Sequence, residues 1–153
     1  LIPNSAYGPW DNFNHESGHV LSALINRFHQ AKIKKLGVVE LWGSGTPKRE
    51  FIYSEDIADA VIFLLEKGIN TRDKPINIGS GSDYSILELA EMIKMTTNFK
   101  GKINWNTNMP DGSPRKLLDS STMESFGWRP KTDLRSGLEN TYQWFLENIA
   151  ACK

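Results

Sequence analysis

The segment with the most chemical potential is the ten-residue stretch Trp42–Phe51. An apolar run ends in Gly43 and Gly45, whose freedom in backbone angles allows a tight turn, and the chain returns through Arg49 into the apolar triplet 51–53. We therefore expect a hairpin-like turn with an indole at one end and a guanidinium at the other. An indole can cover a flat base or sugar, and a guanidinium can hold a phosphate by two parallel hydrogen bonds. The pair predicts a nucleotide-linked ligand; the alternative is a solvated surface turn.

Two further side chains depend on a helix that is expected to begin near His19. The positive end of the helix dipole disfavours an imidazolium there, so His19 is a candidate for proton exchange near neutral pH; otherwise it is a capping or surface residue. Arg27 would lie further along the flank of the apolar stripe, where a guanidinium needs a partner or must extend its head into water. His15 and His29 lack such a context and are interpreted as surface residues.

The periodicity of apolar residues predicts the elements that must position these side chains. Helices are expected over residues of about 20–31, 54–68, 85–93 and 133–148, with Ile149 on the inner face of the last. Strands are expected at 38–42, 49–53, 75–78 and 103–105. Strands that are separated by helices favour an α/β fold over a β-sandwich.

Capping signals mark the starts of several helices. Ser54 precedes two acidic residues, and Ser85 and Ser121 each stand three positions before a glutamate, which is the spacing of a capping box. Gly79 and Gly81 follow the 75–78 strand. We interpret them as a strand-end turn rather than a phosphate-binding loop, because no G-x-x-G-x-x-G pattern opens a helix here.

Composition excludes several classes of protein. The 153 residues fit one domain or a large piece of one, and their 18 basic and 18 acidic residues cancel, which argues against a nucleic-acid binder. No run approaches the roughly 18 apolar residues of a membrane helix, and no signal peptide is recognisable. The single cysteine, Cys152, excludes a disulfide within one chain, and the scattered carboxylates predict no metal. The expected location is cytoplasmic.

Six segments together resemble the GDP-L-fucose synthase family, a branch of the extended short-chain dehydrogenases/reductases and of the NAD-dependent epimerase/dehydratases. They are residues 6–13, 17–20, 42–51, 77–81, 110–119 and 141–145, in the family's order and at about its spacing. Members epimerise GDP-4-keto-6-deoxymannose at C3 and C5 and reduce C4 with NADPH. The resemblance implies a Rossmann-type α/β fold, an NADP-dependent oxidoreductase and epimerase activity, a GDP-sugar substrate and, commonly, a homodimer.

The resemblance also implies roles for individual residues. His19 would be the catalytic acid/base and would lie against the nicotinamide. The other cofactor-binding residues would be Pro3, Asn4, Ser5 and Ala6, although the amide here stands one position earlier than in the usual family pattern. The substrate-binding residues would be Val20, Arg27, Trp42, Arg49, Asp111 and Lys116, with Lys116 preferred to Arg115 as a phosphate contact.

The family's Gly-rich phosphate loop, its Tyr-x-x-x-Lys pair and the Ser and Cys of its active site would all lie upstream of Leu1. We therefore expect residues 1–153 to be the substrate-binding C-terminal portion of a longer enzyme, without the N-terminal NADP-binding Rossmann portion, and inactive alone. There are two rival interpretations. One is a related GDP-keto-sugar enzyme, such as a heptose reductase, and the other is a non-catalytic module that kept the nucleotide-sugar pocket.

Overall fold

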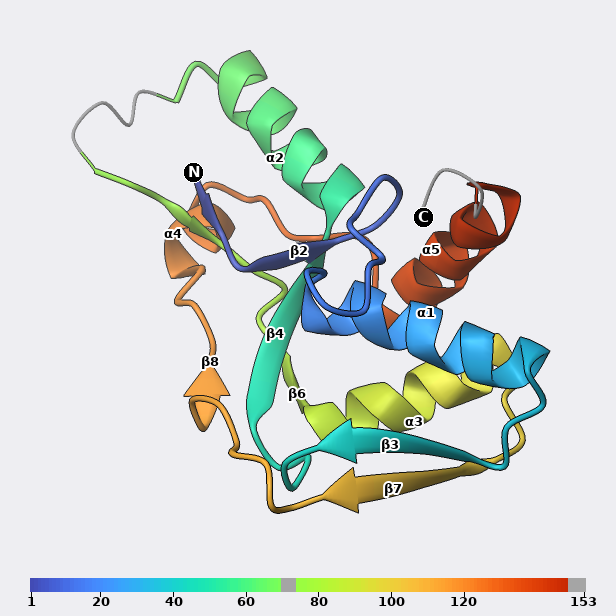
Figure 1. Ribbon diagram of the computed structural model, residues 1–153. Coiled ribbons are helices and arrows are strands. Elements are labelled where there is room, and N and C mark those ends of the chain that lie inside the picture. Colours follow the sequence, from blue (N-terminus) through green and yellow to red (C-terminus); the bar gives the residue numbers. More distant parts are fainter. Residues whose placement is uncertain (70–73, 149–153) are drawn as a thin grey trace.

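The structure is a computed structural model that describes residues 1–69 and 74–148 (Figure 1). Its helices are α1 (Val20–Ile33), α2 (Ser54–Glu66), α3 (Ile86–Thr97), α4 (Ser121–Ser125) and α5 (Leu134–Asn148). Its strands are β1 (Ile2–Pro3), β2 (Ser5–Tyr7), β3 (Val38–Trp42), β4 (Lys48–Tyr53), β5 (Asn77–Ile78), β6 (Asp83–Ser85), β7 (Lys102–Asn106) and β8 (Arg115–Lys116). The α/β class and the positions of the main helices are as expected. Ile149 and Cys152 lie outside the described residues.

The described strands form three small sheets. β1 pairs in parallel with β5, and β3 pairs in parallel with β7. β4 organises the third sheet, because it pairs in parallel with β2 and β8 and antiparallel with β6. Figure 1 shows β3 and β7 side by side below α3, whereas β2 lies near the start of α2. The long strand β4 runs between these two regions and connects them.

The predicted hairpin of residues 38–53 is wrong. β3 pairs with β7 in a register that places Trp42 opposite Asn106, and β4 belongs to a different sheet. The turn itself is tight, as expected: Gly43 and Gly45 have φ values of 77° and 75°. A Cβ on Gly45 would lie 2.7 Å from the ring of Trp105, so the turn packs against β7. The strand that pairs with β3 comes from far along the chain, which a local turn signal cannot reveal.

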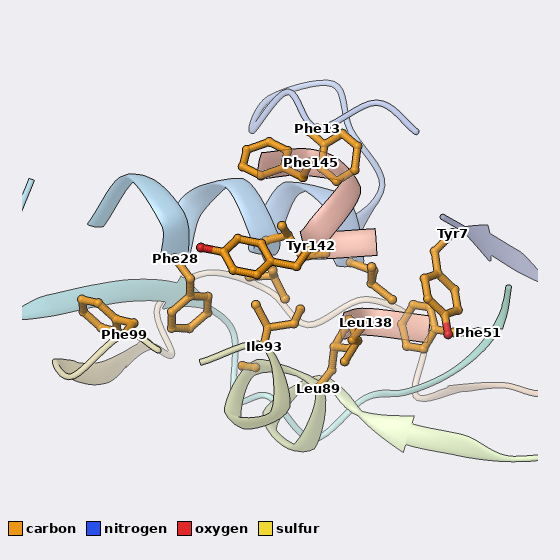
Figure 2. Close-up of a cluster of buried hydrophobic side chains, with 14 of the residues drawn as sticks. Tyr7, Phe13, Phe28, Phe51, Leu89, Ile93, Phe99, Leu138, Tyr142 and Phe145 are labelled. Carbon is orange, nitrogen blue, oxygen red and sulfur yellow. The ribbon is translucent and has the colours of Figure 1, made fainter. Parts of the chain in front are cut away.

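The main hydrophobic core lies between α1, α3 and α5 (Figure 2). Figure 2 shows Tyr142 of α5 near Phe28 of α1 and Ile93 of α3, with Phe145 beside Phe13 and Leu138 beside Leu89. A second cluster joins α2, β5 and α4 and consists of Ile52, Ala60, Ile76, Ile78, Met123 and Trp128. The main core fixes α1 and thereby the residues at its start.

His29 is buried in this core, at 6% exposure, so its interpretation as a surface residue is wrong. Its Nδ1 lies 3.0 Å from the Tyr142 hydroxyl, and its ring packs edge-on against Phe145 with 5.1 Å between centroids. Burial lowers the pKa of His29 and raises the pKa of Tyr142. Both partners come from α5, so nothing close to His29 in the sequence indicated its burial.

The predicted helix starts have different outcomes. At α3, Ser85 Oγ accepts a hydrogen bond from the Glu88 amide at 3.1 Å, and the Ser85 amide donates to the Glu88 carboxylate at 2.8 Å, so the capping box is complete. Ser121 is instead the first helical residue of α4, and no capping box forms there. Ser54 likewise begins α2, because the extended backbone of β4 continues to Tyr53, which is the N-cap. These two predicted N-caps are wrong by one residue.

Ser85→Ala should therefore lower the free energy of unfolding by about 1 kcal/mol, the usual cost of removing a side-chain cap. Ser121→Ala makes the same chemical change at the box that does not form, and it should cost much less. Urea-unfolding curves of the wild type and both variants measure this difference. Equal losses in the two variants would contradict the assignment.

Candidate active site

The loop before α1 presents His19 to solvent. His19 is the N-cap of α1, its backbone is extended, and its side chain is 82% exposed. Its Nδ1 lies 4.0 Å from Asp11 Oδ1, and Asp11 accepts a hydrogen bond from the buried Ser22 hydroxyl of α1. The loop is thus attached to the helix, while the imidazole stays accessible to a ligand.

All the predicted substrate-binding residues except Lys116 line one cleft. Val20, Trp42, Arg49 and Asp111 line a cavity of about 200 Å³. Val20, Trp42 and Arg27 line a second cavity, of about 630 Å³. Val20, Trp42 and Ile86 border both cavities, so the two are adjoining parts of a single cleft. Residues from α1, β3, β4 and the 110–112 loop, far apart in sequence, therefore meet here.

Trp42 and Arg27 face the cleft from neighbouring elements. The Trp42 side chain stands at the end of β3 and is 63% exposed, which suits stacking on a flat ligand. Arg27 is half-buried on α1, and its Nη1 donates to the Glu40 carbonyl at 3.1 Å. This hydrogen bond fixes the guanidinium against β3. Arg27 therefore has a partner within the chain and also lines the larger cavity.

Arg49 is held in place by main-chain carbonyls. Its Nη1 donates to the Lys48 carbonyl at 2.7 Å and to the Ser113 carbonyl at 2.6 Å. These bonds direct the guanidinium toward the 110–113 loop, which forms one wall of the smaller cavity. A guanidinium fixed at a cleft wall in this way is suited to bind an anionic ligand.

Asp111 attaches the same loop to the turn between β3 and β4. Its carboxylate accepts hydrogen bonds from the Ser44 amide at 2.9 Å and from the Ser44 hydroxyl at 2.7 Å, and these bonds lower the pKa of Asp111. A Cβ on Gly43 would lie 2.3 Å from Asp111 Oδ1, so this approach requires a glycine. The Asp111 side chain therefore holds the loop over the cleft.

The two basic residues of β8 differ in their partners. Arg115 forms an ion pair with Asp83, and the hydrogen bond and charge of Arg115 lower the pKa of that carboxyl. Lys116 is exposed and stands opposite Arg49 in the parallel register of β4 and β8. Arg115 is thus committed to a partner within the chain, which favours Lys116 as the cation that could join Arg49.

The predicted cofactor turn, Pro3–Ala6, lies where the N-terminal strand changes partner. Pro3 ends β1 opposite Ile78, and Ser5 begins β2 opposite Phe51, so the chain passes between two sheets at Asn4. The side-chain oxygen Oδ1 of Asn4 accepts a hydrogen bond from the Ser5 amide at 2.9 Å. Strand ends where the neighbouring strand changes are favoured ligand sites in α/β folds. None of these four residues lines the cleft around Trp42.

Glu50 was missed by the sequence reasoning. It is fully buried, and its carboxylate accepts hydrogen bonds from the Asn4 side-chain amide, the Gly81 amide at 2.7 Å and the Leu118 amide at 3.0 Å. The available signal was its place on an apolar strand, since a carboxylate there needs several partners.

Two features are absent from residues 1–69 and 74–148, the part of the chain that the structure describes. No group of three or more His, Cys, Asp or Glu side chains in these ranges is placed to hold a metal ion. Within the same ranges, no helix has the length and apolar character needed to span a membrane.

The sequence profile of the NAD dependent epimerase/dehydratase family matches residues 1–79, which is more than half of the 153 residues. This chain belongs to that family. The placement made from the sequence is thereby confirmed, together with the α/β fold. Among its relatives in the epimerase/dehydratase family is probable GDP-L-fucose synthase 1 of Oryza sativa subsp. japonica, which is 48% identical over 152 residues, 99% of this chain and 46% of the rice protein.

Solved structures of similar proteins support the same family. The chain matches a GDP-L-fucose synthetase from Naegleria fowleri bound to NADP with a TM-score of 0.91 and 31% identity, over 100% of this chain and 48% of that one. It matches a GDP-6-OMe-4-keto-L-xylo-heptose reductase from C. jejuni with a TM-score of 0.84 and 33% identity, over 97% of this chain and 53% of that one. This epimerase/dehydratase family member spans about half the length of the curated relatives it matches.

Proposed function

We propose that this chain is the substrate-binding C-terminal portion of a GDP-L-fucose synthase-like enzyme. That enzyme epimerises GDP-4-keto-6-deoxymannose at C3 and C5 and reduces C4 with NADPH. The observation that carries the proposal is the single cleft lined by Val20, Arg27, Trp42, Arg49 and Asp111. Relatives that are named GDP-L-fucose synthases, at 43% to 51% identity, support it.

The cleft offers the groups that a GDP-sugar needs. Trp42 can stack on the base or a sugar, and Arg49 with Lys116 can hold the diphosphate by charge-assisted hydrogen bonds. Arg27 supplies a further cation in the lining of the larger cavity. His19 adjoins Val20, a lining residue of both cavities, and its accessible imidazole can give and take a proton at the sugar carbons.

The proposed cofactor is NADP, held at its nicotinamide end by the Pro3–Ala6 turn and His19. When bound, the reduced cofactor supplies the hydride for C4. The turn suits such a group because its main chain lies at a change of strand partner, with the Asn4 side chain fixed by two hydrogen bonds. The Tyr, Ser and Cys groups that the family uses would come from the upstream portion of the enzyme.

An apolar surface supports the proposal that an NADP-binding portion packs on this chain. α2 exposes Val61, Ile62 and Leu65, the last at 75%, and β1 exposes Ile2. β1 and β5 form a two-stranded parallel sheet, an arrangement that is normally covered on both faces. The relatives' additional length could supply that cover. In the proposal the complete enzyme is a cytoplasmic homodimer.

The test of the proposed activity uses the full-length protein. With GDP-4-keto-6-deoxymannose it should consume NADPH and release GDP-L-fucose, measured by absorbance and mass spectrometry. The 153-residue chain should consume none, because the proton donor for the C4 oxygen and the groups that bind the adenosine lie outside it. NADPH consumption by the isolated chain would contradict its assignment as a C-terminal portion.

The likeness to the C. jejuni heptose reductase favours a second candidate, a GDP-keto-heptose reductase. A pure reductase would consume NADPH without exchanging carbon-bound hydrogen with solvent, so deuterium uptake from D₂O distinguishes the two enzymes. Binding of GDP without turnover of either sugar would instead favour a non-catalytic module.

A further inference from the structure

Glu50 accepts hydrogen bonds from three separate segments of the chain: the cofactor turn, the turn after β5 and the end of the 110–118 loop. One of its donors is the side chain of Asn4 in the cofactor turn, the second is the amide of Gly81 after β5, and the third is the amide of Leu118, which follows β8. All three partners are N–H donors, which suits both oxygens of a carboxylate. Among the described residues, no lysine or arginine forms an ion pair with Glu50.

The approach of the Gly79–Gly81 turn to Glu50 depends on a missing side chain. A Cβ on Gly79 would lie 2.3 Å from Glu50 Oε1, so only glycine leaves room for the carboxylate. Gly79 and Gly81, which do not belong to a phosphate-binding loop, therefore have a structural role beside Glu50. The turn serves as a fixed support for Glu50.

Arg49, the residue before Glu50 on β4, lines the proposed substrate cleft. Side chains alternate along a strand, so Arg49 faces the cleft while Glu50 is directed into the interior. The segment 110–118 is attached to β4 at three points: Arg49 to the Ser113 carbonyl at 2.6 Å, the Lys48 amide to the Pro114 carbonyl at 2.8 Å, and Glu50 to the Leu118 amide at 3.0 Å. A shift of this loop therefore acts on Glu50.

We propose that Glu50 is a positioning residue that couples the cofactor turn to the substrate loop, so that NADP and the GDP-sugar bind cooperatively. The inference rests on the proposed function of these two regions. A ligand that orders the 110–118 loop fixes the Leu118 amide and, through Glu50, the side chain of Asn4. The reverse holds for a ligand on the Pro3–Ala6 turn, because coupling between two binding sites is reciprocal.

The experiment measures GDP affinity of the full-length enzyme by calorimetry, with and without saturating NADP⁺. In the wild type, NADP⁺ should lower the Kd for GDP by about fivefold or more, the lower end of usual coupling factors. In Glu50→Gln the ratio should fall to about 1, because an amide turns an NH₂ group toward N–H donors. A wild-type ratio of 1, or an unchanged ratio in Glu50→Gln, overturns the inference.

Two further variants separate coupling from stability. Asp56→Asn alters another buried carboxylate, which accepts hydrogen bonds from the Lys131 and Thr132 amides, both at 3.1 Å, and contacts neither loop. It should lower the melting temperature and keep the wild-type ratio. Asn4→Ala removes the cofactor-side donor to Glu50, together with the acceptor of the Ser5 amide, and should abolish the coupling. It tests the inference if Glu50→Gln does not fold. Failure of the wild type to bind GDP or NADP⁺ contradicts the proposed function itself, whereas binding of both without coupling contradicts only the role of Glu50.

Discussion

His19→Gln in the full-length enzyme should reduce solvent deuterium incorporation at C3 and C5 by at least the roughly 100-fold that is typical of losing an acid/base group. Epimerisation removes a proton beside the keto group and returns one on the opposite face. Glutamine keeps a polar side chain of similar volume and cannot shuttle a proton. Because the His19 ring is 82% exposed and makes no capping bond, its replacement should leave the fold intact.

Reduction of a keto-sugar that already has the final configuration should fall much less in this variant, since in the proposed mechanism hydride transfer depends on the cofactor and on a tyrosine of the upstream portion. Mass-resolved deuterium uptake and NADPH consumption, measured on the same samples, give the two rates. His15→Gln makes the same chemical change at an exposed histidine of the same loop that lines the larger cavity, and it should lower deuterium uptake much less than His19→Gln does. Normal deuterium uptake in His19→Gln would remove His19 from the chemistry.

Arg49→Ala should weaken GDP-sugar binding by about 1.5–3 kcal/mol, the usual scale for hydrogen bonds to a charged group, which is roughly a 10- to 150-fold rise in Kd. The guanidinium lines the cleft and also anchors the Ser113 carbonyl, so both direct contact and loop position are lost. Arg49→Lys keeps the positive charge but lacks the planar guanidinium, so its Kd for GDP should lie between those of the wild type and Arg49→Ala.

Arg115→Ala is the matched control, because this second arginine is occupied by Asp83. It should change the Kd for GDP much less than Arg49→Ala. Calorimetric titration with GDP measures all three variants. An unchanged Kd in Arg49→Ala would contradict a role of Arg49 in binding the GDP-sugar.

Local patterns predicted the elements well where the determinants are close in sequence. The apolar spacing of α1, α3 and α5 reflects burial of one helix face, and the box of Ser85 and Glu88 lies within a single turn. Pairing of β3 with β7 depends on contact between segments about sixty residues apart, so the tight turn at Gly43 suggested a hairpin that does not form. The burial of His29 depends on α5 for the same reason.

The candidate site shows a similar division. The motif around Trp42 and Arg49 pointed to the cleft, which needs α1 and the 110–112 loop to complete it. The role of Glu50 could not be predicted, because two of its three donors are main-chain amides that carry no signature in the sequence. Its third partner, Asn4, was noted only as an amide shifted by one position.

The use of main-chain donors around Glu50 also determines how freely the sequence can vary there. An amide hydrogen is available from every residue except proline, so Leu118 could be exchanged for many side chains without loss of its bond to the carboxylate. Only three positions depend on residue type: Asn4 must supply its side-chain amide, Glu50 its carboxylate, and position 79 must be a glycine because a Cβ would meet Glu50. The side chain at position 118 can therefore change while the hydrogen-bonded connection from this segment through Glu50 to Asn4 is retained.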